Sequence, residues 1–387
     1  MLGRDMKETN SNAMKVPSIN SNIERFKALC AILGIIVSAI IIYYLYIYKR
    51  SYTVDLQSKS TDVLNYISSH KNKDKPINLQ DQFDSDLSGI IISNADFSNI
   101  DFTGVNLSHA NFNNVIFSGT NLSKVNAQWL SCNACNFTNA QIVKANFNFA
   151  KIVYSDFSNV DFTDSTFQFS HLQNSTFTHA NFNKINLEKA DFSAADLSNA
   201  KFNNTNLNQA LFVKSKMNNV IFINSNLYGI NFYQSVMEGA KFNESFMESV
   251  NLDEVIASSA DFSRVNLSWA NLSNGNFNQA NFNQANLTNA YGARSSFVGA
   301  NYSKANFQFA DMKRVNLTGA NLSNSDLTKA DFRYAILHKA DLTASKLSGS
   351  NFSDADLSEI NLTNASIINT LFTNTNLSNA VGVIVAQ

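Results

Sequence analysis

The amino-acid sequence predicts an all-β solenoid that follows one transmembrane α-helix. An apolar residue, here called the centre of a unit, recurs at every fifth position in 59 consecutive units from Leu87 to Leu377. The residue two before a centre is small or β-branched in every unit but one, where it is Leu130, and the residue one before it is Asn or Asp in 37 of the 59 units. A run of 21 uncharged residues, from Ala28 to Tyr48, precedes the repeat. A fixed period sustained over so long a stretch determines the architecture before any other feature.

The N-terminal region divides into a polar tail at residues 1–27 and a predicted transmembrane helix at residues 28–48. A helix of 21 residues spans roughly 30 Å, which matches the hydrocarbon layer of a bilayer. Lys and Arg flank both ends of the run, and four tyrosines gather at the end where rings favour the membrane interface: Tyr43, Tyr44, Tyr46 and Tyr48. The alternatives are a secretory signal peptide, although no small-x-small cleavage site follows the run, and a buried soluble helix.

The orientation in the membrane follows from the positive charges beside the helix. Five Lys or Arg residues precede it, and three follow it within the segment 49–68. This bias favours a single-pass protein with the N-terminus in the cytoplasm and the repeat domain on the extracytoplasmic side. If Met14 is the true start, Arg4 and Lys7 are absent and the bias disappears.

The repeat is flanked by two short connecting segments. Residues 49–76 are predicted to form a linker with a possible short helix, and residues 77–86 are expected to cap the first coil, since a solenoid needs a shielded end. The repeat domain covers residues 87–380. The apolar C-terminal tail at residues 381–387 is either a last strand that covers the end or a sticky edge for an end-to-end homodimer.

A period of five residues fits neither an α-helix nor a flat strand. It suits a square coil in which each unit forms one side, with the centre and the small residue inward and the other three outward. Asn, Asp and Ser suit such a coil because their side chains satisfy nearby backbone groups and tolerate turn geometry. The same residues disfavour a helix.

Two units illustrate the pattern, Ala180-Asn181-Phe182-Asn183-Lys184 and Ala320-Asn321-Leu322-Ser323-Asn324. In these units the chain resembles the pentapeptide repeat family, whose consensus is A-(D/N)-L-x-x, and the resemblance covers about four fifths of the sequence. It implies a right-handed quadrilateral parallel β-helix with four units per coil. Just under 15 coils at the ~4.8 Å spacing of paired strands would form a rod roughly 70 Å long. Side chains four units apart should then stack as internal ladders, for example Phe162, Phe182 and Phe202.

Composition and motifs argue against several kinds of function. Residues 77–387 carry a net charge of −6 with no basic stripe, so direct nucleic-acid binding is not expected. Cys132 and Cys135 have the spacing of redox and metal sites, but both occupy inward positions and are expected to pack as small hydrophobes, with a disulfide open to them outside the cell. The histidines are scattered, and a convex rod has no cleft for paired carboxylates. We therefore expect no catalytic residues, cofactor or metal, and no enzyme.

Outward apolar side chains that the repeat does not require are the candidate partner-binding residues. Trp129, Phe149 and Phe169 each lie two after a centre and are separated by four units, so they should form an external aromatic column that His109 extends. Trp269 and Phe309 lie further along the same edge. A second group shares one side of adjacent coils: Leu211, Val213 and Tyr233, with Ile221 and Ile223 nearby. Each ring could instead fold over its own corner, but exposed apolar patches tend to mark contact sites.

These features favour a non-enzymatic, membrane-anchored interaction scaffold with an unidentified protein partner. Two alternatives are open. Some pentapeptide repeat proteins mimic DNA and occupy gyrase, as quinolone-resistance proteins do, but no side of this rod concentrates Asp and Glu. Others are bacterial effectors delivered into a host cell, where an anchored member could insert in a host membrane.

Overall fold

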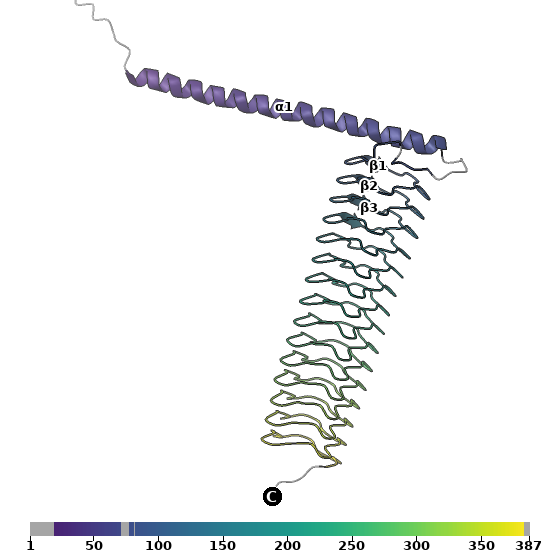
Figure 1. Ribbon diagram of the computed structural model, residues 1–387. Coiled ribbons are helices and arrows are strands. Elements are labelled where there is room, and N and C mark those ends of the chain that lie inside the picture. The colour runs from purple at the N-terminus through teal and green to yellow at the C-terminus, as the bar shows by residue number, and fades with distance from the viewer. Residues whose placement is uncertain (1–18, 71–76, 81, 383–387) are drawn as a thin grey trace, which may run out of the picture. The chain divides into compact units, whose positions relative to one another are not determined.

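The computed structural model describes residues 19–70, 77–80 and 82–382 of the chain. The chain forms two compact units, Met1–Ser58 and Lys59–Gln387. Helix α1 (Ile19–His70) contributes residues to both units, and strands β1 to β4 belong to the second. The second unit is a stack of coils that advances steadily toward the C-terminus (Figure 1).

The described part of the first unit, residues 19–58, is helical. No Gly or Pro lies between Gly34 and Pro76, which explains why the helix continues without a break through the expected linker. Side chains are described from Ile36 onward, so residues 28–35 of the predicted span lie outside the described side chains. The apolar residues of this unit are exposed between Ile36 and Tyr48. Among the described residues, no helix is both long enough and apolar enough to cross a membrane.

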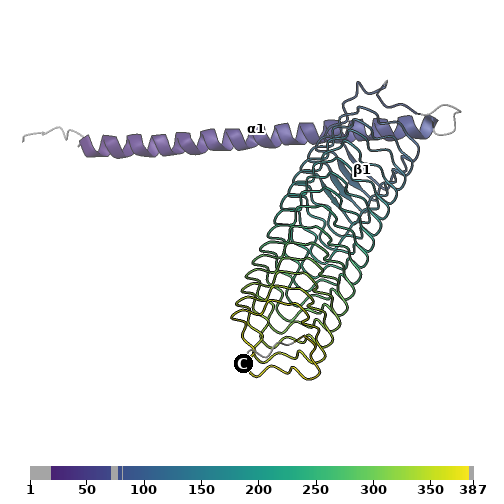
Figure 2. The ribbon, with the colours of Figure 1, turned by 60° about the horizontal axis from the view of Figure 1, so that its bottom comes forward.

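The second unit is a parallel β-solenoid in which every coil comprises four of the five-residue repeats. Strands β1 (Ile91–Ser93), β2 (Asn111–Asn113), β3 (Ser131–Asn133) and β4 (Lys151–Val153) form one parallel sheet in the order β1-β2-β3-β4. Each strand pairs with the equivalent strand of the next coil, for example Phe112 with Cys132. Isolated parallel bridges continue the same register on all sides of the coil to Asn361 and Val381. The predicted four-repeat coil is confirmed, and Figure 2 shows the stack from a second direction.

The Asn and Asp residues before the centres stabilise each side of the coil in two ways. Their side-chain oxygen accepts the backbone N–H two residues later, as Asp341 Oδ1 does from Thr343 N at 3.0 Å. Their amides also link one coil to the next, as Asn301 Nδ2 donates to Asn281 Oδ1 at 3.1 Å. These bonds satisfy polar groups that the turn leaves unpaired, which explains the recurrence of Asn and Asp at this position.

The corners of the coil require left-handed backbone. The residue two after each centre has φ near +60°, for example +60° at Lys184 and +58° at Asn324. Asn and Gly tolerate this conformation best, and they fill 25 of the 59 corner positions. A bulky side chain at a corner is therefore conformationally strained, and the fold does not require a bulky residue there.

The interior contains the predicted aromatic ladders. Phe182 and Phe202 stack with ring centroids 4.5 Å apart, and Phe202 and Phe222 follow at 4.7 Å. Stacking continues through the later members of this ladder to Tyr302. These rings are almost completely buried, so burial of each contributes roughly 1.5–3 kcal/mol.

Tyr302 introduces a polar hydroxyl group into this apolar interior. It is fully buried against Phe282 at 4.6 Å, and its hydroxyl has no hydrogen-bond partner among the described residues. Burial also raises the pKa of the phenol well above its ordinary value. An unpaired buried hydroxyl is costly.

We therefore expect Tyr302→Phe to stabilise the rod by roughly 1–2 kcal/mol, because it removes the unpaired group and retains the ring. Thermal unfolding measures the change. The matched control is Tyr334→Phe, which alters an exposed tyrosine and should leave the melting temperature unchanged. A lower melting temperature for Tyr302→Phe would mean that the hydroxyl has a stabilising partner.

The cap of the first coil differs from the prediction. Residues 77–86 contribute to it, since Leu79 is fully buried and Phe83 packs against the core. The end of α1 also covers the coil, because Val63 and Ile67 belong to the buried core and Ser60 Oγ accepts the N–H of Ile91 at 3.0 Å. Residues 49–70 are thus helix rather than linker, and the last turns of that helix are part of the cap.

The C-terminal coil has a less completely buried interior. Ile367, Phe372 and Leu377 are only partly buried, whereas the earlier centre Leu357 is fully buried. Val381 is the last residue with a described bridge. Residues 383–387, which include most of the predicted apolar tail, lie outside the described residues, and the end-to-end dimer stays a prediction.

Candidate functional site

An external aromatic column lies along one corner of the rod. We call His109, Trp129, Phe149 and Phe169 the aromatic ridge. Their rings are nearly parallel, with centroids 6.4 Å apart for His109 and Trp129, 4.5 Å for Trp129 and Phe149, and 5.2 Å for Phe149 and Phe169. Trp129 is 53% exposed and Phe169 is 39% exposed, and Phe149 between them is half-buried, so these rings are not part of the core.

A lysine that was not among the predicted partner residues lies at the end of the ridge. Lys189 lies one coil beyond Phe169, and its Nζ is 5.1 Å from the centroid of that ring. A cation over an aromatic face is attracted by the ring quadrupole. The signal in the sequence was the spacing of one whole coil from Phe169 to Lys189, since it places Lys189 at the next corner of the same column.

The ridge occupies positions that disfavour bulky residues. Trp129 has φ of +60° and Phe149 has φ of +61°. Seven Phe, Trp or Tyr residues lie at described corners with positive φ: Trp129, Phe149, Tyr154, Phe169, Trp269, Phe309 and Tyr334. Five of the seven fall in the single corner column that contains the ridge. Because that conformation is strained for bulky side chains, the concentration in one column points to a role beyond folding.

Stacking determines which part of each ring is accessible. Neighbouring rings cover one another's faces, with interplanar angles of 8° and 7° in the two pairs that include Phe149. The ring edges therefore form the accessible surface along the ridge. Bases stack on open aromatic faces, whereas the faces of these rings are covered by their neighbours. The ridge is a narrow convex apolar strip.

The other predicted partner-binding residues do not form a continuous stack of rings. Trp269 and Phe309 are each 52% exposed at the same corner, but Asn289 separates them, and Lys329 Nζ lies 5.2 Å from the ring of Phe309. Of the second group, Leu211 is exposed, while Val213 is half-buried.

Tyr233, the third member of the second group, is held by a polar contact. Its Oη donates to Glu254 Oε1 at 3.3 Å, and Gln234 donates to the other oxygen of Glu254 at 2.7 Å. Partial burial and the charge of Glu254 raise the pKa of Tyr233. The second group is therefore a mixed polar and apolar surface rather than a ring stack.

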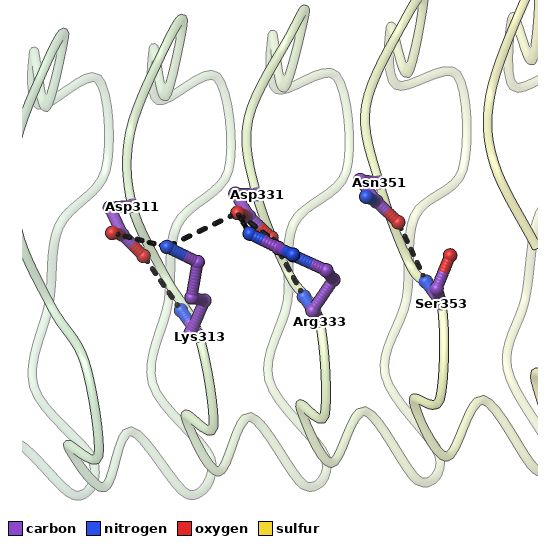
Figure 3. A network of polar contacts seen from close by, with 6 residues as sticks. All are labelled: Asp311, Lys313, Asp331, Arg333, Asn351 and Ser353. Carbon is purple, nitrogen blue, oxygen red and sulfur yellow. Dashed lines mark hydrogen bonds and ion pairs between the residues drawn. The ribbon is translucent and has the colours of Figure 1, made fainter.

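A ladder of ion pairs lies on the same side of later coils (Figure 3). Lys313 Nζ is 2.8 Å from Asp311 and 3.4 Å from Asp331, and Arg333 is 2.7 Å from Asp331. The hydrogen bond and charge of Asp311 raise the pKa of Lys313. Burial alone would raise the pKa of Asp331, but the hydrogen bonds and charge of Arg333 outweigh it, and the pKa is lowered. In the next coil Asn351 and Ser353 replace the charged pair.

Cys132 and Cys135 are joined by a disulfide in the interior. Both are almost completely buried, which agrees with the predicted inward positions. The sequence left a disulfide open to them, and the structure contains it, because adjacent inward positions at one corner bring the two sulfurs within bonding distance.

The described residues offer no obvious chemical centre. Within them, no group of three His, Cys, Asp or Glu side chains lies close enough to hold a metal ion. One shallow, open depression is lined mainly by amides, including Asn243, Asn281 and Asn301, beside an exposed Glu244–Arg264 pair at 3.9 Å.

Comparison with known proteins identifies the family. The family model described as Pentapeptide repeats matches residues 83–119, 155–193, 266–301, 280–319, 310–349 and 340–379. A second, described as Pentapeptide repeat region, matches residues 175–262. The chain belongs to the pentapeptide repeat family. No curated protein matches this pentapeptide repeat protein.

Several solved structures are similar to this chain at low identity. HetL, a pentapeptide repeat protein involved in heterocyst differentiation regulation in Nostoc sp. strain PCC 7120, is 20% identical over 82% of this chain and 94% of its own, with a TM-score of 0.15. Rfr23 of Cyanothece 51142 is 25% identical over 25% of this chain and 63% of its own, with a TM-score of 0.17. QnrB1, a plasmid-mediated fluoroquinolone resistance protein, is 17% identical over 52% and 91%, with a TM-score of 0.29.

Proposed function

We propose that this pentapeptide repeat protein is a non-enzymatic interaction rod that binds a protein partner through the aromatic ridge. The single observation that carries the proposal is the external stack of rings on strained corners, in which Trp129 and Phe169 are exposed and Phe149 between them is half-buried. Packing of the core does not require these rings, because the ladder of buried centres is complete beneath them.

The chemistry of the ridge indicates the shape of its partner. Stacked rings expose a narrow convex apolar edge, and large aromatic residues dominate the energetics of protein interfaces when they enter a pocket. The fitting surface is an apolar groove on another protein. The stack restricts ring motion before binding, so little side-chain entropy is lost when the groove closes over it.

We also propose that residues 28–48 tether the rod to a membrane, with the rod on the extracytoplasmic side. The tether rests on the uncharged sequence, and the exposed apolar residues from Ile36 to Tyr48 support it, since a helix that is apolar all round needs an apolar environment. The disulfide between Cys132 and Cys135 supports the orientation, because disulfides persist in oxidising compartments.

The DNA-mimicking alternative has less support. A DNA-like rod needs a continuous acidic surface, whereas acidic side chains here often alternate with cations, as Asp331 does with Lys313 and Arg333 (Figure 3). Opposite charges in such a ladder cancel the field that would attract a DNA-binding protein.

A variant with Trp129→Ser, Phe149→Ser and Phe169→Ser tests the ridge. We expect it to lose a crosslinked partner that the intact protein retains, because three apolar anchors disappear, and a loss of at least about tenfold in recovery corresponds to one moderate hot spot. The readout is a quantitative crosslinking pull-down. Tyr154→Ser is the matched control, since it removes an exposed aromatic side chain from another corner.

The variant should fold, because Ser accepts a corner position at least as well as Trp or Phe. Equal melting temperatures establish this point. If the triple variant melts like the intact protein and recovers the same partners in the same amounts, the ridge is not a binding site.

A further inference from the structure

One side of the rod carries a self-complementary arrangement of charge. This side, which we call the charged face, comprises the outward residues of eight successive coils from Leu211 to Asp354, and the ion-pair ladder of Figure 3 is part of it. In each coil these are the residue before a centre and the two after it. The face includes the second group of outward apolar residues, Leu211, Val213 and Tyr233.

Charges of opposite sign occupy equivalent positions in two central coils of this face. Asp253 and Glu254 lie in the third coil, and Lys313 and Arg314 occupy the same two positions in the sixth coil. At the outer ends, the corner residue is Lys214 in the first coil and Asp354 in the eighth. The four corner residues Lys214, Glu254, Arg314 and Asp354 are exposed.

We propose that the charged face binds the same face of a second copy of this chain, with the two rods antiparallel. A twofold axis perpendicular to two side-by-side rods reverses their direction and places each column of side chains opposite the same column of the partner. When the axis lies between the fourth and fifth coils, the first coil meets the eighth, the second meets the seventh and the third meets the sixth.

This register places three pairs of opposite charge, and no pair of like charge, at facing positions. The pairs, each formed twice by symmetry, are Lys214 with Asp354, Asp253 with Lys313, and Glu254 with Arg314. Tyr233 meets Arg333, which suits a cation over an aromatic ring. The amides of Asn231 and Asn251 meet the carboxylates of Asp331 and Asp311, which accept hydrogen bonds.

Neighbouring registers are less favourable. A shift of one coil in one direction retains only Glu254 opposite Arg294 as an opposite-charge pair. A shift in the other direction retains only Asp253 opposite Arg333 and places Arg294 against its own copy. The charge pattern therefore favours the proposed register over its two neighbours, since like charges in an interface oppose association.

Contacts within each rod hold the interacting groups in place. Glu254 accepts from Gln234 at 2.7 Å, and Asp253 accepts from Asn274 at 2.8 Å. Arg314 lies 5.3 Å from the ring centroid of Tyr334. Side chains that are already ordered lose less entropy on association. The face is about 34 Å long at the strand spacing of ~4.8 Å. Because it is only one narrow side of the rod, it buries less surface area than a stable dimer interface needs. We therefore expect dimerisation to depend on protein concentration.

The test is a charge exchange in the full-length protein, kept in mild detergent and measured by sedimentation velocity over a range of concentrations. We expect the unaltered protein to form dimers and each of Glu254→Arg and Arg314→Glu to weaken dimerisation at least about tenfold, because each places like charges opposite one another twice. The double variant should restore association to within about threefold. Residues 254 and 314 lie three coils apart, about 14 Å, so contact within one chain cannot explain the rescue.

Glu244→Arg is the matched control, since it makes the same charge change on the opposite side of the rod, and it should leave dimerisation unaltered. A monomer at all concentrations would overturn the proposal. So would dimers that the single variants leave intact, which would indicate association through another surface such as the C-terminal end. Failure of the double variant to restore dimers would overturn the antiparallel register.

Discussion

Phe222→Asp should unfold the middle of the rod. Phe222 is completely buried between Phe202 at 4.7 Å and Phe242 at 5.2 Å. Loss of the ring costs roughly 3–5 kcal/mol, and an unpaired carboxylate in the same place adds a penalty that the stacked rings on either side do not relieve. Because each coil is stabilised mainly by its neighbours, the damage should spread outward from the coils that contain Phe202 and Phe242.

Thermal unfolding and amide hydrogen exchange measure this effect. We expect a lower melting temperature and lost protection centred on residues 202–242. Asn224→Asp is the matched control, because it introduces the same carboxylate two residues away at an exposed corner of the same coil and should change little. An unaltered melting curve for Phe222→Asp would contradict the register of the whole repeat.

Deletion of residues 1–50 should move the protein completely from the membrane fraction to the soluble fraction. The deletion removes the uncharged run 28–48, and we propose that insertion of this run into lipid attaches the protein to the membrane. Alkaline extraction followed by immunoblotting measures the distribution. The deletion spares Ser60, Val63 and Ile67, so the first coil keeps its cap. A truncated protein that still sediments with membranes would show that the tether lies elsewhere.

Most of the rod could be predicted from the sequence because the repeat is local and constant in phase. Each centre such as Phe182 has the same surroundings as the equivalent centre one coil later, so one assignment fixes all others. The aromatic ridge could be predicted for the same reason: Trp129, Phe149 and Phe169 differ only by whole coils. Their nearly parallel rings confirm the column, whereas binding to a partner is still a proposal.

The features that the sequence did not predict depend on contacts outside the period. Val63 and Ile67 lie in a helix, and nothing in the five-residue pattern indicates that its last turns cover the first coil. The disulfide between Cys132 and Cys135 depends on how two inward side chains approach each other at a corner. The repeat pattern predicts that both side chains point inward, but it does not predict the direction of each sulfur. The charged face requires comparison of coils that are far apart in sequence, because its symmetry is visible only once the coils are stacked.

The aromatic ridge as a binding site is the central claim, and proximity labelling in native membranes tests it most directly. The measurement compares proteins labelled by the intact chain with those labelled by the Trp129→Ser, Phe149→Ser and Phe169→Ser variant. The ridge hypothesis predicts at least one partner that the intact protein and the Tyr154→Ser control label and the triple variant does not. Identical sets of labelled proteins, with the variant folded and in the same membrane, would contradict it.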